Sequence, residues 1–248
     1  MKPKVITSLK NPLIQTLLGV KKRAKSAGEL FLVDGWHLVE MGRNAGILEG
    51  LLLLEAAPDY DEIPQYLVNQ AIIDKLKNVK TNPGVIGILK RKMRPVVGGT
   101  HFLVLDRIQD PGNMGNLLRS ALAFNYDGVL LTKGCVDIFH PKVLAATQGA
   151  FFFLPTKEIE LEDLKALQEE GFELVVSTLE RATKLEAVEP PDLLLLVVGN
   201  EGAGVDDKIA AMADILVKIP ISEVDSLNAA SAGAILLYYF RPNADSGL

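Results

Sequence analysis

The chain has 248 residues, of which 48% are hydrophobic and 23% are charged, a composition typical of globular rather than disordered proteins. No apolar run approaches the ~20 residues that cross a bilayer, and the first residues lack the apolar segment of a signal peptide, so we expect a cytoplasmic protein. A single cysteine, Cys135, excludes an internal disulfide framework and a cysteine-based metal cluster. The formal net charge of −5 argues against a nucleic-acid partner only if the charges are evenly spread.

The charges are in fact divided along the chain. Residues 1–95 contain 15 Lys and Arg against 9 Asp and Glu, whereas residues 96–248 contain 11 against 22. Residues 96–150 are neutral, so the acidic excess follows them. One basic cluster precedes the first acid, Glu29, and a second, Lys-Arg-Lys-Met-Arg at 90–94, ends the basic part. Such clusters favour binding to a phosphate backbone, and a solvated helix face with a lysine-rich linker is the alternative.

Apolar runs alternate with helical patterns along the whole chain. The expected strands are 30–33, 50–54, 65–68, 85–89, 102–105, 128–131, 173–177, 193–198 and 215–219. The expected helices are 12–25, 36–45, 70–77, 113–125, 139–148, 161–170, 205–212 and 226–240. Near-continuous Leu and Val runs in this alternation predict an α/β fold with parallel sheets covered on both faces.

The segment 91–100 is the expected domain boundary. It lacks periodicity, contains Pro95 and the Gly98-Gly99 pair, and coincides with the change in charge sign. We therefore predict a basic α/β domain at 1–94 and a second α/β domain at 95–248.

Several common sites are missing from the sequence. The three histidines are scattered without the spacing of a metal site, so we expect no metal. No nucleophile elbow, phosphate-binding Walker loop or Gly-x-Gly-x-x-Gly fingerprint is present. The order G-x-x-G-x-G after the strand at 193–198 leaves a dinucleotide site as an alternative.

The first segment that indicates a site is 103–126. A strand ends, Asp110-Pro-Gly turns the chain, and Asn113 stands where a helix N-cap is expected. On the following helix, Asn113, Asn116 and Arg119 form a polar strip beside the apolar stripe. Open α/β sheets place ligand sites beyond the carboxyl ends of parallel strands, although a capping Asn and a solvent-facing Arg are also common.

The second segment, 193–205, is an apolar strand followed by a turn of small residues. Its glycines allow the backbone to approach a ligand closely, and Glu201 is the only acid in the turn. The alternative is a tight turn in which Glu201 stabilises the N-terminus of the following helix.

The third segment, 217–239, contains Ser226-Leu-Asn228 at the expected start of a helix. The first turns of this helix, 229–234, consist almost entirely of very small residues. They allow close packing against another element, within the fold or across a dimer, and Ser226 is a candidate helix cap.

Taken in this order, the three segments resemble the three sequence motifs of the SpoU/TrmH family of RNA ribose 2′-O-methyltransferases. The matching patterns are Asn113-x-Gly115-x-x-x-Arg119, Gly199-x-Glu201-Gly-x-Gly204, and Ile219-Pro220 followed by Ser226-Leu227-Asn228. Ser8-Leu-Lys-Asn-Pro12 and Phe31-Leu-Val-Asp-Gly35 are similar to the family's small RNA-substrate-binding domain. The resemblance implies a C-terminal parallel-sheet methyltransferase domain with a deep trefoil knot and a homodimeric protein.

The resemblance also implies a role for each motif residue. Arg119 is expected to activate the ribose 2′-hydroxyl, with Asn113, Glu201, Ser226 and Asn228 completing the catalytic site. The methyl donor is expected to be S-adenosylmethionine (AdoMet), held by main-chain groups at Gly199, Ile219 and Leu227, with Thr178 as a weaker candidate.

The expected substrate is a structured RNA, 23S-type rRNA in preference to tRNA. The expected RNA contacts are N-terminal cations: Lys10, Lys21, Lys22, Arg23 and Lys25. Where many relatives have Arg-Ala-Ser, this chain has Ala145-Ala-Thr147, so a second RNA-facing arginine is missing. A non-catalytic RNA-binding protein and a dinucleotide-dependent oxidoreductase are the alternatives from other classes.

Overall fold

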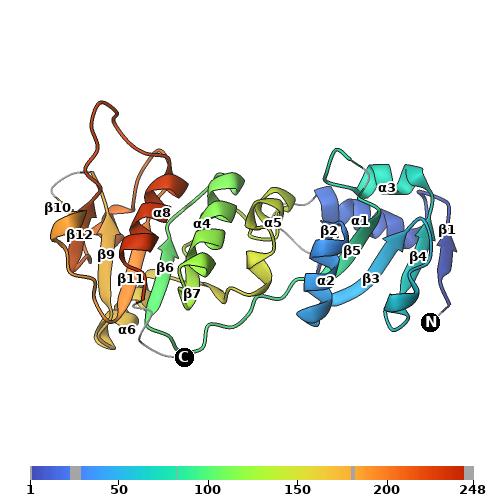
Figure 1. The fold of residues 1–248 in the computed structure, drawn as a ribbon, viewed down its shortest axis with the longest axis horizontal. Coiled ribbons are helices and arrows are strands. Elements are labelled where there is room, and N and C mark those ends of the chain that lie inside the picture. The colour runs from blue at the N-terminus through green and yellow to red at the C-terminus, as the bar shows by residue number, and fades with distance from the viewer. Residues whose placement is uncertain (1, 23–28, 82, 180–181, 243–248) are drawn as a thin grey trace. The chain divides into compact units, whose positions relative to one another are not determined.

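The computed structural model describes residues 2–22, 29–81, 83–179 and 182–242. The chain divides into two compact units. Figure 1 shows the fold, coloured by residue number from blue at the N-terminus to red at the C-terminus. Unit 1 comprises Met1–Lys92 with Phe139–Phe152, and unit 2 comprises Met93–Ile138 with Phe153–Leu248.

The segment Phe139–Phe152 departs from the expected division at 94/95, which left it in the second domain. The ring of Phe31 lies 5.1 Å from that of Phe139 and 6.0 Å from that of Phe151, measured between centroids. Since apolar rings are stabilised by mutual burial, the segment packs with unit 1 despite its place in the sequence.

Unit 1 has a five-stranded sheet in the order β1-β4-β3-β5-β2. Its strands are β1 (Lys4–Ile6), β2 (Leu30–Asp34), β3 (Leu48–Leu53), β4 (Gln65–Val68) and β5 (Val85–Lys90). The prediction of a parallel sheet is wrong for this unit, because β5 runs antiparallel to both β2 and β3. A strand buried on both faces is an unbroken apolar run in either direction, so its sequence does not reveal which way it runs.

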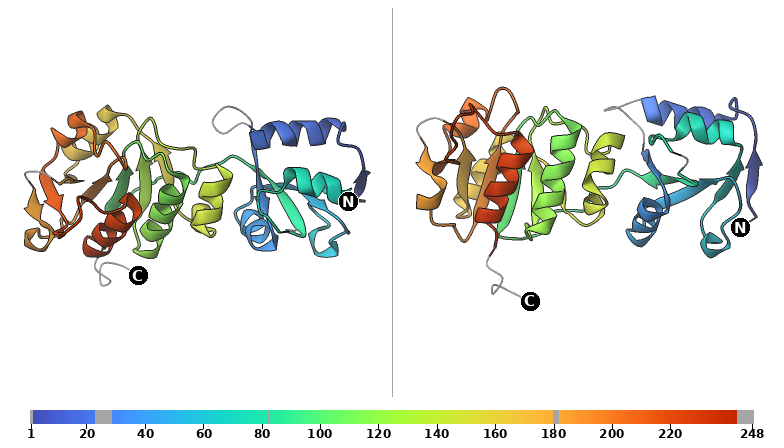
Figure 2. Two further views of the ribbon diagram at one scale, coloured as in Figure 1. Left: turned by 90° about the horizontal axis from the view of Figure 1, so that it is seen from above. Right: turned by 45° about the horizontal axis from the view of Figure 1, so that its top comes forward.

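Helices cover both faces of this sheet (Figure 2). They are α1 (Pro12–Lys22), α2 (Trp36–Asn44) and α3 (Gln70–Leu76), with α5 (Pro141–Thr147) also in unit 1. On one face, Ile14 and Leu17 of α1 and Ile72 of α3 join a buried cluster with Ile86 and Ile88 of β5.

Unit 2 has a seven-stranded sheet in the order β10-β12-β9-β11-β6-β7-β8. Its strands are β6 (His101–Leu105), β7 (Gly128–Leu131), β8 (Thr156–Glu158), β9 (Glu173–Ser177), β10 (Thr183–Lys184), β11 (Leu194–Val198) and β12 (Ile215–Lys218). Every pairing between these strands is parallel, which confirms the predicted parallel α/β fold of this domain.

The helices of unit 2 lie on both faces of its sheet. They are α4 (Pro111–Ala123), α6 (Leu161–Glu169), α7 (Asp207–Ala210) and α8 (Ala229–Tyr239). Leu164 of α6 and Ile209 of α7 share a core with Leu195 and Val197 of β11. α8 packs on α4, and a methyl group at Gly233 would collide with the side chain of Leu117. Gly233 of α8 therefore serves close packing within the fold.

The sequence missed the strands β1, β8 and β10, which are two or three residues long. Segments this short contain too little alternation to be recognised. Within the described part of the chain, no helix has the length and apolar character of a membrane span.

Candidate active site

A pocket lies at the carboxyl ends of three neighbouring strands of unit 2, β12, β9 and β11. Its volume is ≈ 420 Å³, within the range of roughly 300–1,000 Å³ that is usual for small-molecule sites. Because the strands are parallel, their carboxyl ends meet at one edge of the sheet, the usual location of ligand sites in open α/β folds.

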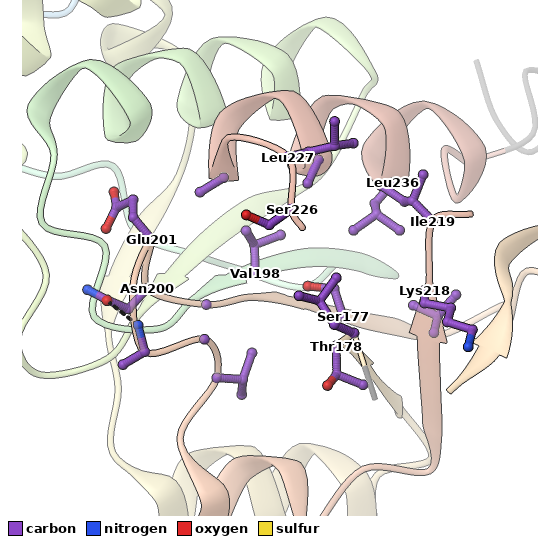
Figure 3. Close-up of a pocket in the computed structure, with 18 of the residues that line it drawn as sticks. Ser177, Thr178, Val198, Asn200, Glu201, Lys218, Ile219, Ser226, Leu227 and Leu236 are labelled. Carbon is purple, nitrogen blue, oxygen red and sulfur yellow. Dashed lines mark hydrogen bonds between the residues drawn. The ribbon is translucent and has the colours of Figure 1, made fainter. Parts of the chain in front are cut away.

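Six of the nine candidate catalytic and cofactor-binding residues line this pocket. They are Thr178, Gly199, Glu201, Ile219, Ser226 and Leu227. Figure 3 shows Ser226 and Leu227 on the segment that leads to α8, with Glu201 and Ile219 on opposite sides. Motifs two and three therefore form one cavity, although the 14 residues 205–218 separate them in the sequence.

The sequence analysis missed several lining residues. Among them are Ser177, Asn200, Lys218 and Leu236. Ser177 and Lys218 end β9 and β12, so their position at the carboxyl end of a parallel strand could have identified them.

The turn after β11 forms one wall of the pocket through its backbone. A methyl group on Gly199 would collide with the carbonyl carbon of Gly204 and the nitrogen of Val205. The side-chain oxygen of Asn200 accepts hydrogen bonds from the backbone N–H groups of Gly202 and Ala203, each at 2.9 Å. The turn is thus closed on itself without bulky side chains, and its main chain is left beside the cavity.

This lining fits the expected methyl donor, AdoMet. The close backbone approach at Gly199 fits a ligand held by main-chain groups, and Leu227 and Leu236 offer apolar surface to a purine ring.

Asn113 connects the three motifs by hydrogen bonds. Its side-chain nitrogen donates to Glu201 Oε1 at 2.9 Å, and its side-chain oxygen accepts from Asn228 Nδ2 at 2.9 Å. The oxygen of Asn228 in turn accepts from the backbone N–H groups of Ala230 and Ser231. A carboxylate only accepts and a backbone N–H only donates, so both ends of this chain of bonds fix which way each amide points.

Two predicted helix caps are wrong. The cap of α4 is Asp110, which accepts a hydrogen bond from the backbone N–H of Asn113 at 2.8 Å, since Pro111 fixes the first helical position. The cap of α8 is Asn228 and not Ser226. Asn113 is therefore inside α4. Of the predicted polar strip, Asn113 is buried, with 8% of its surface exposed, whereas Asn116 and Arg119 are exposed.

Glu201 is bound to the start of α4 and not to the helix that follows it. Besides Asn113, its carboxylate accepts hydrogen bonds from the backbone N–H groups of Asp110, at 3.2 Å, and Gln109, at 3.4 Å. Desolvation raises the pKa of this carboxyl, but the hydrogen bonds from Asn113, Asp110 and Gln109 outweigh it and lower the pKa below 4.5.

This lowered pKa predicts how Glu201 contributes to stability. The ionised carboxylate favours the folded state above pH 4.5, and the contribution disappears as pH falls through the lowered pKa. Glu201→Gln is therefore expected to reduce the free energy of unfolding at neutral pH, with a difference from wild type that shrinks below pH 4.5. Urea denaturation across this range measures the difference, and a difference that grew in acid would contradict the assignment.

Arg119 lies on the exposed surface of α4, outside the residues that line the pocket. Within the described ranges, its guanidinium makes no hydrogen bond or ion pair. The guanidinium carries five donors and a permanent positive charge. Because it is exposed, it is available to bind an anionic ligand from outside unit 2.

The predicted RNA-binding cations have different surroundings. Lys10 is exposed just before α1, and Lys22 is the last residue of α1. The ammonium of Lys21 donates to the carbonyl oxygens of Lys75, at 2.9 Å, and Lys77, so it caps the C-terminal end of α3. The sequence did not indicate this structural role. Arg23 and Lys25 lie outside the described residues.

Comparison with known proteins agrees with this geometry. The SpoU rRNA Methylase family model matches residues 100–238, more than half of the chain. The chain is 29% identical to the 23S rRNA (guanosine(2553)-2′-O)-methyltransferase RlmP of Bacillus subtilis over 89% of its own length and 92% of the relative's. It is 30% identical to the uncharacterized tRNA/rRNA methyltransferase slr1673 of Synechocystis over 95% of this chain and 93% of that protein.

A solved structure is similar to this chain over nearly its whole length. The AdoMet-bound rRNA methyltransferase from Sinorhizobium meliloti superimposes with a TM-score of 0.86 at 26% identity, covering 96% of this chain and 97% of that one. The match therefore includes both units. With motifs two and three lining one pocket, motif one hydrogen-bonded to both, and the family model matching across all three, the chain belongs to the SpoU rRNA methylase family.

Proposed function

We propose that this protein transfers the methyl group of AdoMet to a ribose 2′-hydroxyl of structured RNA, most favourably 23S-type rRNA. The observation that carries the proposal is the hydrogen-bonded chain from Glu201 through Asn113 to Asn228, which joins the pocket to the helix that bears Arg119. The pocket for the methyl donor and the exposed Arg119 are thus connected through one network of side-chain hydrogen bonds.

AdoMet, when bound, supplies a methyl group on a positively charged sulfur that a hydroxyl oxygen can attack directly. The backbone at Gly199, Ile219 and Leu227, which line the pocket, would hold the donor, and Thr178 is a further lining residue that could contact it. Much of the rate gain then comes from placing the hydroxyl in line, which is worth on the order of 7 kcal/mol in favourable cases.

Arg119 orients the RNA and does not act as a simple base. The pKa of a guanidinium is roughly 12 or higher, so it does not readily accept a proton. It pairs instead with an RNA phosphate and points the 2′-hydroxyl toward the pocket. The hydroxyl proton passes to solvent water late in the transfer. In this proposal the remaining motif residues hold Arg119 and the pocket in place; they are Asn113, Glu201, Ser226 and Asn228.

The assignment to rRNA rests on relatives that match both units. The Bacillus subtilis relative is named for a guanosine of 23S rRNA, and the Sinorhizobium meliloti structure is named an rRNA methyltransferase. A tRNA substrate is the alternative, because the Synechocystis relative is named for both RNA classes. The oxidoreductase alternative has no comparable support.

Unit 1, residues 1–92 with 139–152, forms the RNA-substrate-binding domain in this proposal, and unit 2 forms the catalytic domain. The phosphate contacts come from Lys10, Lys22, Arg23 and Lys25. Lys21 is adjacent to Lys22 in the sequence, and its ammonium is bound to the end of α3. Binding to phosphates releases counterions, so RNA affinity should fall steeply with salt.

Lys10→Ala tests this binding surface. The change is expected to weaken RNA binding at every salt concentration and to reduce the slope of log affinity against log salt by about 0.7–0.9. Filter binding over a salt series measures the slope. The matched control is Lys165→Ala, an exposed lysine on α6, which should leave the slope as in wild type. Equal effects of the two substitutions would argue against an N-terminal RNA site.

We further infer that the protein is a cytoplasmic homodimer whose C-terminal segment forms a trefoil knot. Ile235 and Tyr238 are 41% and 55% exposed on α8, which packs on α4, and they offer apolar surface suited to a second copy. The passage of the chain from β12, near one end of the sheet, back to α8 on α4 and β11 is consistent with a threaded path. Analytical ultracentrifugation tests the dimer.

The decisive experiment incubates the protein with methyl-labelled AdoMet and separate rRNA and tRNA transcripts. Label on one ribose of the rRNA supports the proposal, and mapping the alkali-resistant linkage identifies the nucleotide. Label on tRNA alone would identify tRNA as the substrate in place of rRNA. Label on a base would contradict ribose methylation.

A further inference from the structure

The end of β6 carries a buried carboxylate that belongs to none of the three motifs. Asp106 is 1% exposed, and its carboxylate accepts hydrogen bonds from Thr132 Oγ1 at 2.8 Å, from the backbone N–H of Asp206 at 2.8 Å and from Arg107 Nε at 3.1 Å. A buried charge needs such partners. One of them, the Asp206 amide, lies at the far end of the turn that follows β11.

The next residue, Arg107, reaches the same turn with three of its groups. Its Nη2 donates to the carbonyl oxygen of Gly204 at 3.3 Å, and its Nη1 lies 3.6 Å from Asp206 Oδ2. Its backbone carbonyl accepts a hydrogen bond from Asn200 Nδ2 at 2.8 Å. Arg107 therefore contacts the beginning, the middle and the end of the turn.

The backbone of Arg107 is in the left-handed region, with φ 54°. Glycine adopts this conformation at little cost, whereas a residue with a side chain is strained there. Strain of this kind persists only where surrounding contacts fix it, and here they are the guanidinium contacts and the hydrogen bond from the Arg107 N–H to Thr132 Oγ1 at 3.1 Å.

Asp106 and Arg107 act on the pocket through the turn. Neither residue lines the pocket, whereas all residues from Gly199 to Val205 do. Gly204 itself has φ 69°, and its carbonyl also accepts from the Asn200 N–H at 3.0 Å, so its position depends on both partners.

We propose that Asp106 and Arg107 are a positioning pair that holds the turn 199–206 in the shape that binds the methyl donor. The inference rests on the proposed function for the identity of that donor. Arg107 is a positioning residue, since it acts through Gly204 and Asp206 and not on the donor itself.

Arg107→Gly is the central variant, because glycine relieves the left-handed strain and so favours folding. It is expected to weaken AdoMet binding about tenfold or more, the loss typical of a charge-assisted hydrogen bond. Arg107→Lys keeps the charge without the fork of donors and should recover only part of the affinity. Lys157→Met is the matched control, since it removes an exposed ion pair with Asp163 elsewhere in unit 2.

Two measurements test the pair in the full chain. Calorimetry gives the dissociation constant for AdoMet, and hydrogen exchange of the free protein reports on the turn. Exchange at the amides of Gly204 and Asp206 should accelerate in Arg107→Gly, with the amides of Leu195 and Val197 in β11 unchanged. Asp106→Asn, which presents N–H groups to the donors around it, should accelerate exchange at Asp206 as well.

The outcomes separate the two proposals. Wild-type affinity for AdoMet in Arg107→Gly overturns the positioning role, as do unchanged exchange in the turn and acceleration that extends equally to β11. If the wild-type protein itself fails to bind AdoMet, the proposed function fails, and exchange at Gly204 and Asp206 still decides whether the pair positions the turn.

Discussion

Arg119→Ala is expected to lower the rate of methyl transfer by at least about 100-fold, the scale of loss when a reacting group is misplaced by about 1 Å. The affinity for AdoMet should stay at the wild-type value, because Arg119 lies outside the donor pocket. Arg119→Lys keeps the charge but loses the planar fork that pairs with a phosphate, so it should restore little of the rate. Single-turnover assays at saturating AdoMet measure the chemical step, and calorimetry measures donor binding.

Lys165→Ala is the matched control for this prediction, since it removes an exposed cation from another helix of unit 2. Its rate should equal that of the wild type. A near-normal rate in Arg119→Ala would falsify the catalytic role of Arg119. A parallel loss of AdoMet binding would instead indicate that the substitution disturbs the frame through α4.

Gly199→Ala is expected to reduce AdoMet affinity by more than about tenfold and to destabilise the protein by about 1–3 kcal/mol. The φ of Gly199 lies outside the left-handed region, so the conformation suits alanine and only space is at issue. The added methyl group would meet the backbone of Gly204 and Val205, which cannot turn aside as a side chain could. The turn must move, and the pocket wall moves with it.

Gly202→Ala provides the control within the same turn. The nearest atom to its added methyl group is Asn200 Oδ1 at 3.7 Å, an ordinary contact, so both affinity and stability should stay near wild type. Comparable losses in the two variants would show that the turn tolerates no side chain anywhere, and the argument from close backbone approach at Gly199 would then be wrong.

Much of the fold was predictable because long buried strands leave a clear pattern. The apolar runs at 128–131 and 173–177 coincide with β7 and β9 to the residue. The direction of β5 was not predictable, since burial on both faces removes the alternation that would mark an antiparallel strand. Nor was the place of Phe139–Phe152, which depends on contacts with residues more than a hundred positions away.

The candidate site was predictable at its three motifs but not in its connections. The sequence pointed to Asn113, Glu201 and Asn228 separately, and the structure joins them by side-chain hydrogen bonds. A cap position has a local signature, and Pro111 with Asp110 was misread because Asn113 is also a good capping residue. The sequence does not indicate a role for Arg107, because a left-handed φ at a non-glycine residue has no sequence pattern by which it can be predicted.

The return of Phe139–Phe152 to unit 1 has a consequence for how the protein can be cut. The chain passes between the units three times, after Lys92, after Ile138 and after Phe152, so cleavage of the linker at 93–100 alone does not release unit 1. Removal of residues 1–92 would also leave the rings of Phe139 and Phe151 without Phe31, which exposes apolar surface prone to aggregation. Experiments that separate RNA binding from methyl transfer are therefore better made with point substitutions in the intact chain than with truncations.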